Sequence, residues 1–303
     1  MSLDTDIRID RQNLKRRLAF WRVVAILAFL AILLMASSWL WEPALGPHIA
    51  RIEVSGVIVD DRERDEVLKA VAENGRIKAL LVRIDSPGGT VVGGEALYNA
   101  LRRVAGQKPV VAVLDTIATS GGYMAAIAAD HIVARKGTIT GSIGVVFQTA
   151  EITTLLEKLG IETTAIKSAP LKAAPSPLEK LTPDVREATQ ALVNDMFELF
   201  IDMVVARRGL SQEEVRRLAD GRVYTGRQAL TERLIDALGG EAEALAWLSE
   251  ARDVDPTLPI RDIEAHPERL FWRKTVDSLL GKRVFSERLT LDGLISLWHP
   301  ERP

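Results

Sequence analysis

The sequence predicts an α/β domain that follows a hydrophobic N-terminal segment. From residue 51 onward, short apolar runs alternate with helical patterns, which is typical of this fold class. The chain has 303 residues, of which 47% are hydrophobic, so it can bury a substantial core. We expect five regions: a cytoplasmic N-terminus (1–22), a transmembrane anchor (23–41), a connector (42–50), the α/β domain (51–250) and a peripheral C-terminal extension (251–303).

The anchor is predicted from an uncharged apolar run at 23–41. As a helix with a rise of about 1.5 Å per residue, it would reach roughly 28 Å, one hydrocarbon thickness. Basic residues precede the run, and the next positive charge after it is Arg51, so the N-terminus should be cytoplasmic and the domain extracytoplasmic. A cleaved signal peptide and a buried helix are the alternatives; bulky residues after Ser38 disfavour cleavage.

Strands and helices are expected in alternation through the domain. Strands are predicted at 51–59, 79–84, 109–114, 131–135 and 162–167, and helices at 93–105, 121–129 and 183–208. Thr182 can cap the longest helix, Pro183 suits its first position and Gly209 suits its exit. Ser211 and Glu214 resemble a capping box for the next helix. One face of helix 183–208 is apolar and should be core or a subunit contact: Val185, Ala188, Leu192, Met196, Leu199 and Met203.

Composition narrows the possible chemistry. A net charge of −2 gives no global basic field, so we expect no nucleic-acid partner. The chain has no cysteine, which excludes disulfides, thiolate nucleophiles and cysteine-bound metals. The four histidines are far apart in sequence and lack ligand spacing, so we expect neither a metal nor a cofactor.

Ser120 is the best candidate nucleophile. It follows a predicted buried strand and precedes Gly121, Gly122 and a predicted helix. Unpaired N–H groups at a helix start favour developing negative charge, and the glycines allow a substrate backbone to approach closely. The alternative is an ordinary helix-capping serine.

Gly88 and Gly89 lie in a loop that follows the predicted strand 79–84, in the run Asp85-Ser86-Pro87-Gly88-Gly89. Successive glycines in such a loop can aim backbone N–H groups at an oxyanion. The alternative is a simple strand-to-helix turn. A phosphate-binding loop is disfavoured because no Lys-Ser/Thr pair follows Gly89.

Lys167 and Lys172 are the candidate bases, since they lie among small residues at 166–177. A lysine acts as a base only when it is uncharged, and burial among apolar groups favours that form. A neutral lysine can then accept the proton of a serine hydroxyl. From this segment alone, two solvated surface lysines are the better interpretation.

Together these stretches resemble the signal peptide peptidase A family, the Ser–Lys peptidases of family S49, over roughly residues 50–248. The matching motifs are LLVRIDSPGG (80–89), ATSGGYMAAIAAD (118–130), GTITGSIGVV (137–146), IKSAPLKAAPSP (166–177) and GRVYTGRQAL (221–230). The resemblance implies a ClpP/crotonase-like fold with Ser120 as nucleophile and Lys172, not Lys167, as general base. It places Gly88 and Gly89, with Gly121, at the oxyanion and substrate-binding site.

The resemblance also implies the biological setting. The active unit would be a homo-oligomeric ring in which each Ser–Lys dyad is shared between subunits. The substrates would be hydrophobic peptides, chiefly remnants of signal peptides, and the chain would sit in the bacterial inner membrane through its single N-terminal anchor.

Other functions remain open at this stage. A crotonase-like acyl hydrolase would use similar backbone donors, but its acyl-CoA substrates are cytoplasmic. A Ser–His–Asp peptidase would have to use His131, which reads as the start of a strand. A membrane scaffold that binds hydrophobic peptides without cutting them would result if Lys172 were misplaced. Residues 251–303, with Leu270, Phe271, Trp272, Leu279 and Leu280, could dock on the body or touch the membrane.

Overall fold

The computed structural model describes residues 17, 20–30, 46–263 and 294–297, and the chain divides into two units, 1–46 and 47–303. In the first unit, residues 20–30 are helical and expose large apolar side chains, among them Phe20 and Phe29. The predicted anchor (23–41) overlaps this helix up to residue 30, and its remainder lies outside the described residues. Within the described part of the chain, no helix combines the length and apolar character that a membrane span requires.

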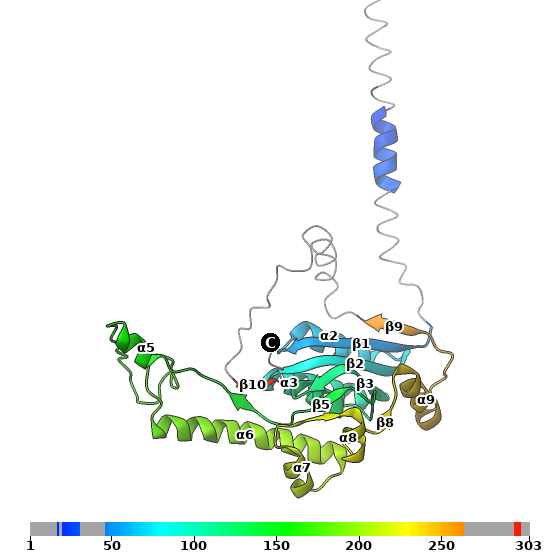
Figure 1. The fold of residues 1–303 in the computed structure, drawn as a ribbon. Helices are drawn as coiled ribbons and strands as arrows, with labels where there is room; N and C mark the ends of the chain where they lie inside the picture. The colour runs from blue at the N-terminus through cyan, green and yellow to red at the C-terminus, as the bar shows by residue number, and fades with distance from the viewer. Residues whose placement is uncertain (1–16, 18–19, 31–45, 264–293, 298–303) are drawn as a thin grey trace, which may run out of the picture. The chain divides into compact units, whose positions relative to one another are not determined.

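The second unit is built on a ten-stranded sheet, so the predicted α/β class is confirmed (Figure 1). The main path runs β6-β10-β2-β3-β4-β8. Off this path, β1 pairs with β2 and β9 pairs with β1, while β5 pairs with β3 and β7 pairs with β5. Strands β1 to β4 are parallel to one another. The strands are β1 His48–Ile58, β2 Ile77–Thr90, β3 Val110–Thr119, β4 His131–Ala134, β5 Ile139–Gly141, β6 Val146–Phe147, β7 Val223–Thr225, β8 Ala237–Leu238, β9 Ile260–Ile263 and β10 Leu294–Leu297.

Helices cover both faces of the central strands. The helices of this unit are α2 Arg62–Glu73, α3 Val91–Ala105, α4 Gly121–Ile127, α5 Thr153–Lys158, α6 Pro183–Arg208, α7 Gln212–Leu218, α8 Gly226–Thr231 and α9 Glu241–Arg252. Leu80 and Val82 point into a core shared with α2, α3 and α4, whereas Ala79 and Leu81 point into a second core under α9. A parallel sheet buried on both faces needs nearly continuous apolar strands, which explains the runs that predicted β2 and β3.

Two predicted elements are wrong. Residues 162–167 contain no strand. The run Asp85–Gly89 is not a loop, because β2 continues through it to Thr90, with a register irregularity after Ile84. Pairing of Gly88 and Gly89 with Val57 and Ile58 of β1 keeps this glycine-rich stretch extended.

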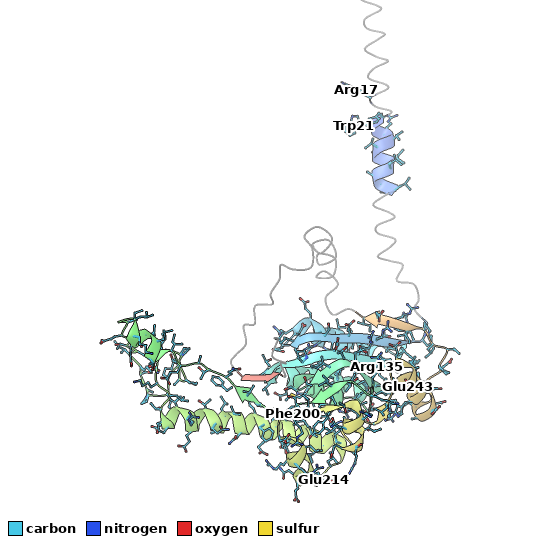
Figure 2. The ribbon with its side chains drawn as sticks, in the orientation of Figure 1. Arg17, Trp21, Arg135, Phe200, Glu214 and Glu243 are labelled. Atoms are coloured by element: carbon cyan, nitrogen blue, oxygen red, sulfur yellow. The ribbon has the colours of Figure 1, made fainter. Side chains whose placement is uncertain are left out.

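Helix α6 has the predicted bounds. The Thr182 side chain accepts from the backbone of Val185, and Gly209 leaves the helix with φ 59°. The second half of α6 contributes Phe200, Ile201, Met203 and Val204 to the core, and Figure 2 labels Phe200 on this part of the helix. In the first half, Leu192 of the predicted apolar face is 44% exposed, so this part of the face is not core within one chain.

Residues 148–182 form an arm between β6 and α6. The arm carries α5 and extends away from the sheet (Figure 1). Its apolar side chains are strongly exposed: Ile166 by 99%, Leu159 by 65% and Leu155 by 57%. Exposed apolar groups at this density mark an interaction surface.

The C-terminal extension contributes to the sheet, so its description as peripheral is wrong for two segments. Strand β9 pairs in parallel with β1, and β10 pairs with β2 and β6. Helix α9 also continues past the predicted boundary at residue 250. The apolar residues 270–272, 279 and 280 lie outside the described residues.

Candidate active site

Ser120 occupies a sharp turn between β3 and α4. Its backbone has φ 55° and ψ −118°, and only 1% of the residue is exposed. A positive φ is unfavourable for a residue with a Cβ, at a cost on the order of 1–3 kcal/mol, and it persists only where the surroundings enforce it. Strained strand-to-helix turns of this kind present the nucleophilic serine in other hydrolases.

Hydrogen bonds on both sides of Ser120 enforce the turn. The Ser120 N–H donates to the Gly141 carbonyl of β5 at 2.8 Å, and the Ser120 carbonyl accepts from Met124 of α4 at 2.9 Å. In the same strand pair, Thr140 Oγ1 of β5 donates to the Ala118 carbonyl of β3 at 2.7 Å. The Ser120 side chain makes no capping bond to α4, so the capping role considered from the sequence is not realised.

The predicted glycines lie beside this turn. A Cβ on Gly121 would stand 3.2 Å from the Gly89 nitrogen, so the two backbones are in close contact. Gly88 has φ 110°, which favours glycine, and a Cβ on Gly89 would stand 1.7 Å from the Ile58 carbonyl oxygen. The Gly88 N–H donates to Ser86 Oγ at 3.1 Å, so this donor is already engaged.

Lys172 is not part of this arrangement within one chain. It lies on the arm with an exposed side chain, whereas Ser120 is buried in the body. Lys167, on the same arm, forms an ion pair with Glu179. The structure therefore brings Ser120, Gly89 and Gly121 together and leaves both candidate lysines elsewhere.

Comparison with known proteins assigns the chain to a family. The sequence model of peptidase family S49 matches residues 102–255, a range that contains Ser120, Gly121 and Lys172. The chain belongs to peptidase family S49. It is a serine peptidase related to signal peptide peptidase A, as the resemblance predicted.

The alignment with this S49 peptidase covers different shares of its relatives' lengths. It is 41% identical to the "Putative protease slr0021" of Synechocystis, over 78% of this chain and 86% of that protein. It is 31% identical to the "Putative signal peptide peptidase SppA" of Enterococcus faecium, over 70% of this chain and 65% of that protein. A ClpP1 mutant structure from Listeria monocytogenes aligns with TM-score 0.44 and 14% identity, over 64% of this chain and 93% of that one. At that score the structural likeness adds nothing to the assignment.

His131 cannot serve Ser120 within one copy of the S49 domain. It pairs with Val111 at the beginning of β3, whereas Ser120 follows the end of that strand. Val111 and Ser120 are nine residues apart along the chain, roughly 30 Å if it is extended. The His131 ring instead stacks on Trp247, with centroids 4.6 Å apart.

No sequence pattern indicated the pocket beside β6. A pocket at the base of the arm is lined by Val146 and Phe147 of β6, by Leu181, and by Thr189 and Val193 of α6. Strand β6 also pairs with β10, next to the glycines of β2. The motif GTITGSIGVV ends at Val146, but nothing in its pattern indicates that a strand starts there.

Proposed function

We propose that this S49 peptidase cuts hydrophobic peptides with Ser120 as nucleophile and Lys172 as general base, the two residues coming from neighbouring copies in a homo-oligomeric ring. The observation that carries the proposal is the enforced positive φ of Ser120 beside Gly89 and Gly121. Strain held in place by a surrounding hydrogen-bond network is characteristic of a reacting residue rather than a helix cap.

The chemistry follows from these positions. Ser120 Oγ forms a bond to the carbonyl carbon of the substrate while its proton passes to Lys172 Nζ. The backbone N–H groups of Gly89 and Gly121 stabilise the oxyanion. The C–N bond then breaks, the amine leaves with the proton from Lys172, and water releases the second product from Ser120 by the reverse sequence.

The exposed arm supports a dyad shared between copies. A lysine acts as a general base only in its neutral form, which burial favours. The exposed Leu155, Leu159 and Ile166 would be buried if the arm packed on a neighbouring body. That packing would also remove water from Lys172 and favour its neutral form.

The apolar pocket beside β6 supports hydrophobic peptides as substrates. Val146, Phe147 and Leu181 line it, and it adjoins the strand edge that a peptide would pair with. The Enterococcus relative carries the name of a signal peptide peptidase. We assign remnants of signal peptides as the substrate class on these two grounds.

The N-terminal run supports attachment to the bacterial inner membrane. Residues 23–41 are uncharged and follow Lys15, Arg16, Arg17 and Arg22, which favours a single span with a cytoplasmic N-terminus and an extracytoplasmic peptidase domain. The test is carbonate extraction of membranes. Full-length protein should stay in the membrane pellet, and a chain that lacks residues 1–42 should be released.

Labelling with a fluorophosphonate probe tests the nucleophile. We expect the assembled protein to be labelled and Ser120→Ala to be unlabelled and inactive. Ser249→Ala, on α9 at the opposite face of the sheet, is the matched control and should be labelled like the unmodified chain. Peptide cleavage that survives in Ser120→Ala would refute the proposal, and hydrolysis of acyl-CoA in place of peptides would favour an acyl hydrolase.

A further inference from the structure

Helix α4 follows the proposed nucleophile at one end and is held by two arginines at the other. Arg207 Nε donates to the Ile127 carbonyl at 2.9 Å, and Arg207 Nη2 donates to the Ala129 carbonyl at 3.0 Å. Arg102 Nη1 donates to the Ala128 carbonyl, also at 2.9 Å. Three consecutive carbonyls therefore accept hydrogen bonds from guanidinium groups. We call Arg102 and Arg207 the arginine clamp.

The arginine clamp joins α4 to two neighbouring helices, since Arg102 lies in the last turn of α3 and Arg207 in the last turn of α6. Asp130 Oδ1 is 3.4 Å from Arg102 Nη1 and 3.8 Å from Arg207 Nη2. Asp130 Oδ2 accepts from the Val110 N–H at 3.1 Å, and the Asp130 N–H donates to the Val110 carbonyl at 2.8 Å. The end of α4 is thus fixed to α3, to α6 and to the start of β3.

Helix α4 is short enough to pass this constraint on to Ser120. It has seven residues, all buried, so its two ends are only about 10 Å apart. The Met124 N–H donates to the Ser120 carbonyl, which makes the nucleophile turn continuous with the first turn of the helix. A shift of α4 along its axis therefore moves Ser120 and Gly121 with it.

Ser120 depends on such a constraint because its turn is strained. Its φ of 55° is unfavourable for a residue with a side chain and persists only where the surroundings enforce it. The bond from the Ser120 N–H to the Gly141 carbonyl fixes the strand side of the turn. The arginine clamp fixes the helix side, and a planar guanidinium that donates two hydrogen bonds does so in a defined geometry.

We propose that Arg102 and Arg207 are positioning residues of the peptidase, which hold α4 where Ser120 and Gly121 act together. Both act through α4 rather than on the reacting atoms. This inference rests on the proposed function for its effect on catalysis, but the hold on α4 can be measured without a substrate. A merely structural cap would change the stability of the domain and leave the rate of each folded site unchanged.

Kinetic constants distinguish positioning from capping. In Arg207→Gln we expect kcat for a hydrophobic peptide to fall about tenfold with KM unchanged, since small misplacements of catalytic groups slow the chemical step. Fluorophosphonate labelling of Ser120 should slow by a similar factor. Arg207→Lys keeps the positive charge and one donor group, so it should recover part of the loss. Arg102→Gln removes a single bond to α4 and is the milder variant, with a fall in kcat of about threefold.

Lys108→Gln is the matched control. Lys108 Nζ donates to the Val71 and Asn74 carbonyls at 2.6 and 2.8 Å, so it is a basic side chain at the end of a different helix, α2. The substitution should lower the free energy of unfolding in urea, as Arg207→Gln does. Its kcat, KM and labelling rate should equal those of the unmodified chain. Circular dichroism under the assay conditions checks that every variant is folded.

Hydrogen exchange measures the hold on α4 without activity. In Arg207→Gln the backbone amides of residues 121–129 should exchange about tenfold faster than in the unmodified chain, because local opening becomes easier. The amides of residues 62–73 in α2 should exchange as before. Lys108→Gln should show the reverse pattern.

The outcomes separate this inference from the proposed function. Unchanged exchange at residues 121–129 in Arg207→Gln would overturn the hold on α4. Faster exchange with unchanged kcat and labelling rate, or an equal fall of kcat in Lys108→Gln, would overturn positioning and leave the arginines as structural caps. An unmodified protein that neither takes up the probe nor cuts peptides would refute the proposed function, and the exchange result would then decide the hold on α4 by itself.

Discussion

Thr119 Oγ1 donates a hydrogen bond to the Pro87 carbonyl at 3.1 Å, which ties the end of β3 to the end of β2. Thr119 is fully buried and directly precedes Ser120, while Pro87 directly precedes Gly88. The bond therefore fixes the nucleophile turn relative to the glycine strand.

We expect Thr119→Val to weaken both stability and activity. The Pro87 carbonyl would lose its Thr119 partner, and leaving a buried group unsatisfied costs about 1–3 kcal/mol. The free energy of unfolding in urea and the rate of fluorophosphonate labelling should both fall. Thr116→Val, an exposed change on the same strand, should alter neither. An unchanged labelling rate in Thr119→Val would show that the bond does not position the site.

Gly121 has little room for a side chain. The Cβ of Gly121→Ala would stand 3.2 Å from the Gly89 nitrogen and push apart the two proposed oxyanion donors. We expect kcat to fall about tenfold to hundredfold, since small misplacements of catalytic groups have effects of this size. Circular dichroism should show the fold retained.

Gly106→Ala is the control for the glycine substitution. Gly106 ends α3 with a helical backbone, and its nearest non-neighbouring atom would lie 3.5 Å from the new Cβ. Its kcat should equal that of the unmodified chain. Equal kcat for Gly121→Ala and Gly106→Ala would remove Gly121 from the oxyanion site.

The shared dyad predicts complementation between two inactive variants. Ser120→Ala and Lys172→Ala should each lose activity by about 10⁴-fold, as for other catalytic dyads and triads. In a ring assembled from equal amounts of both, about one site in four combines an intact serine with an intact lysine from its neighbour. Peptide cleavage should return to that fraction.

Lys167→Ala is the matched control for the lysine. It removes the ion pair with Glu179 on the same arm but leaves Lys172 in place. It should keep most of the peptidase activity. Mixed rings, verified by native mass spectrometry, that recover no activity would contradict a dyad shared between subunits.

His131 should make the domain sensitive to acid. Burial lowers the pKa of His131, with a smaller opposing effect of Asp236, whose carboxylate is 3.9 Å away. The pKa of a histidine in an unfolded chain is about 6.5. At a pH below the unfolded pKa, the unfolded state takes up a proton that the folded state does not. The contribution of His131 to the free energy of unfolding is therefore fully present above the unfolded pKa, and it is lost as the pH falls toward the folded pKa.

His131→Gln removes this titration. Urea unfolding of both proteins at about pH 7.5 and about pH 5.5 measures the effect. The unmodified protein should lose more stability between the two conditions than His131→Gln. Equal losses would show that the stacked imidazole titrates alike in both states.

Local signals predicted some of the structure closely. Helix α6 begins and ends as expected because its cap, its first proline and its exit glycine act within one turn of the helix. The Ser211–Glu214 capping box is confirmed for the same reason. The Ser120 turn could be located from the strand and the glycines, although its positive φ depends on Gly141 in β5.

Pairing between distant segments limited the rest of the prediction. The run Asp85–Gly89 has the composition of a turn, but β1 and β10 hold it as a strand. The segment 162–167 has the pattern of a strand but lies on the arm, where no neighbouring strand pairs with it. The distance between Lys172 and Ser120 depends, in our proposal, on a second copy, which no pattern within one chain encodes.

The separation of Ser120 and Lys172 within one chain has a consequence for when the peptidase becomes active. In the proposed function, a solitary copy carries the nucleophile without its base, so it stays inactive until copies assemble. In the proposed ring, peptidase activity begins only at protein concentrations at which the copies assemble.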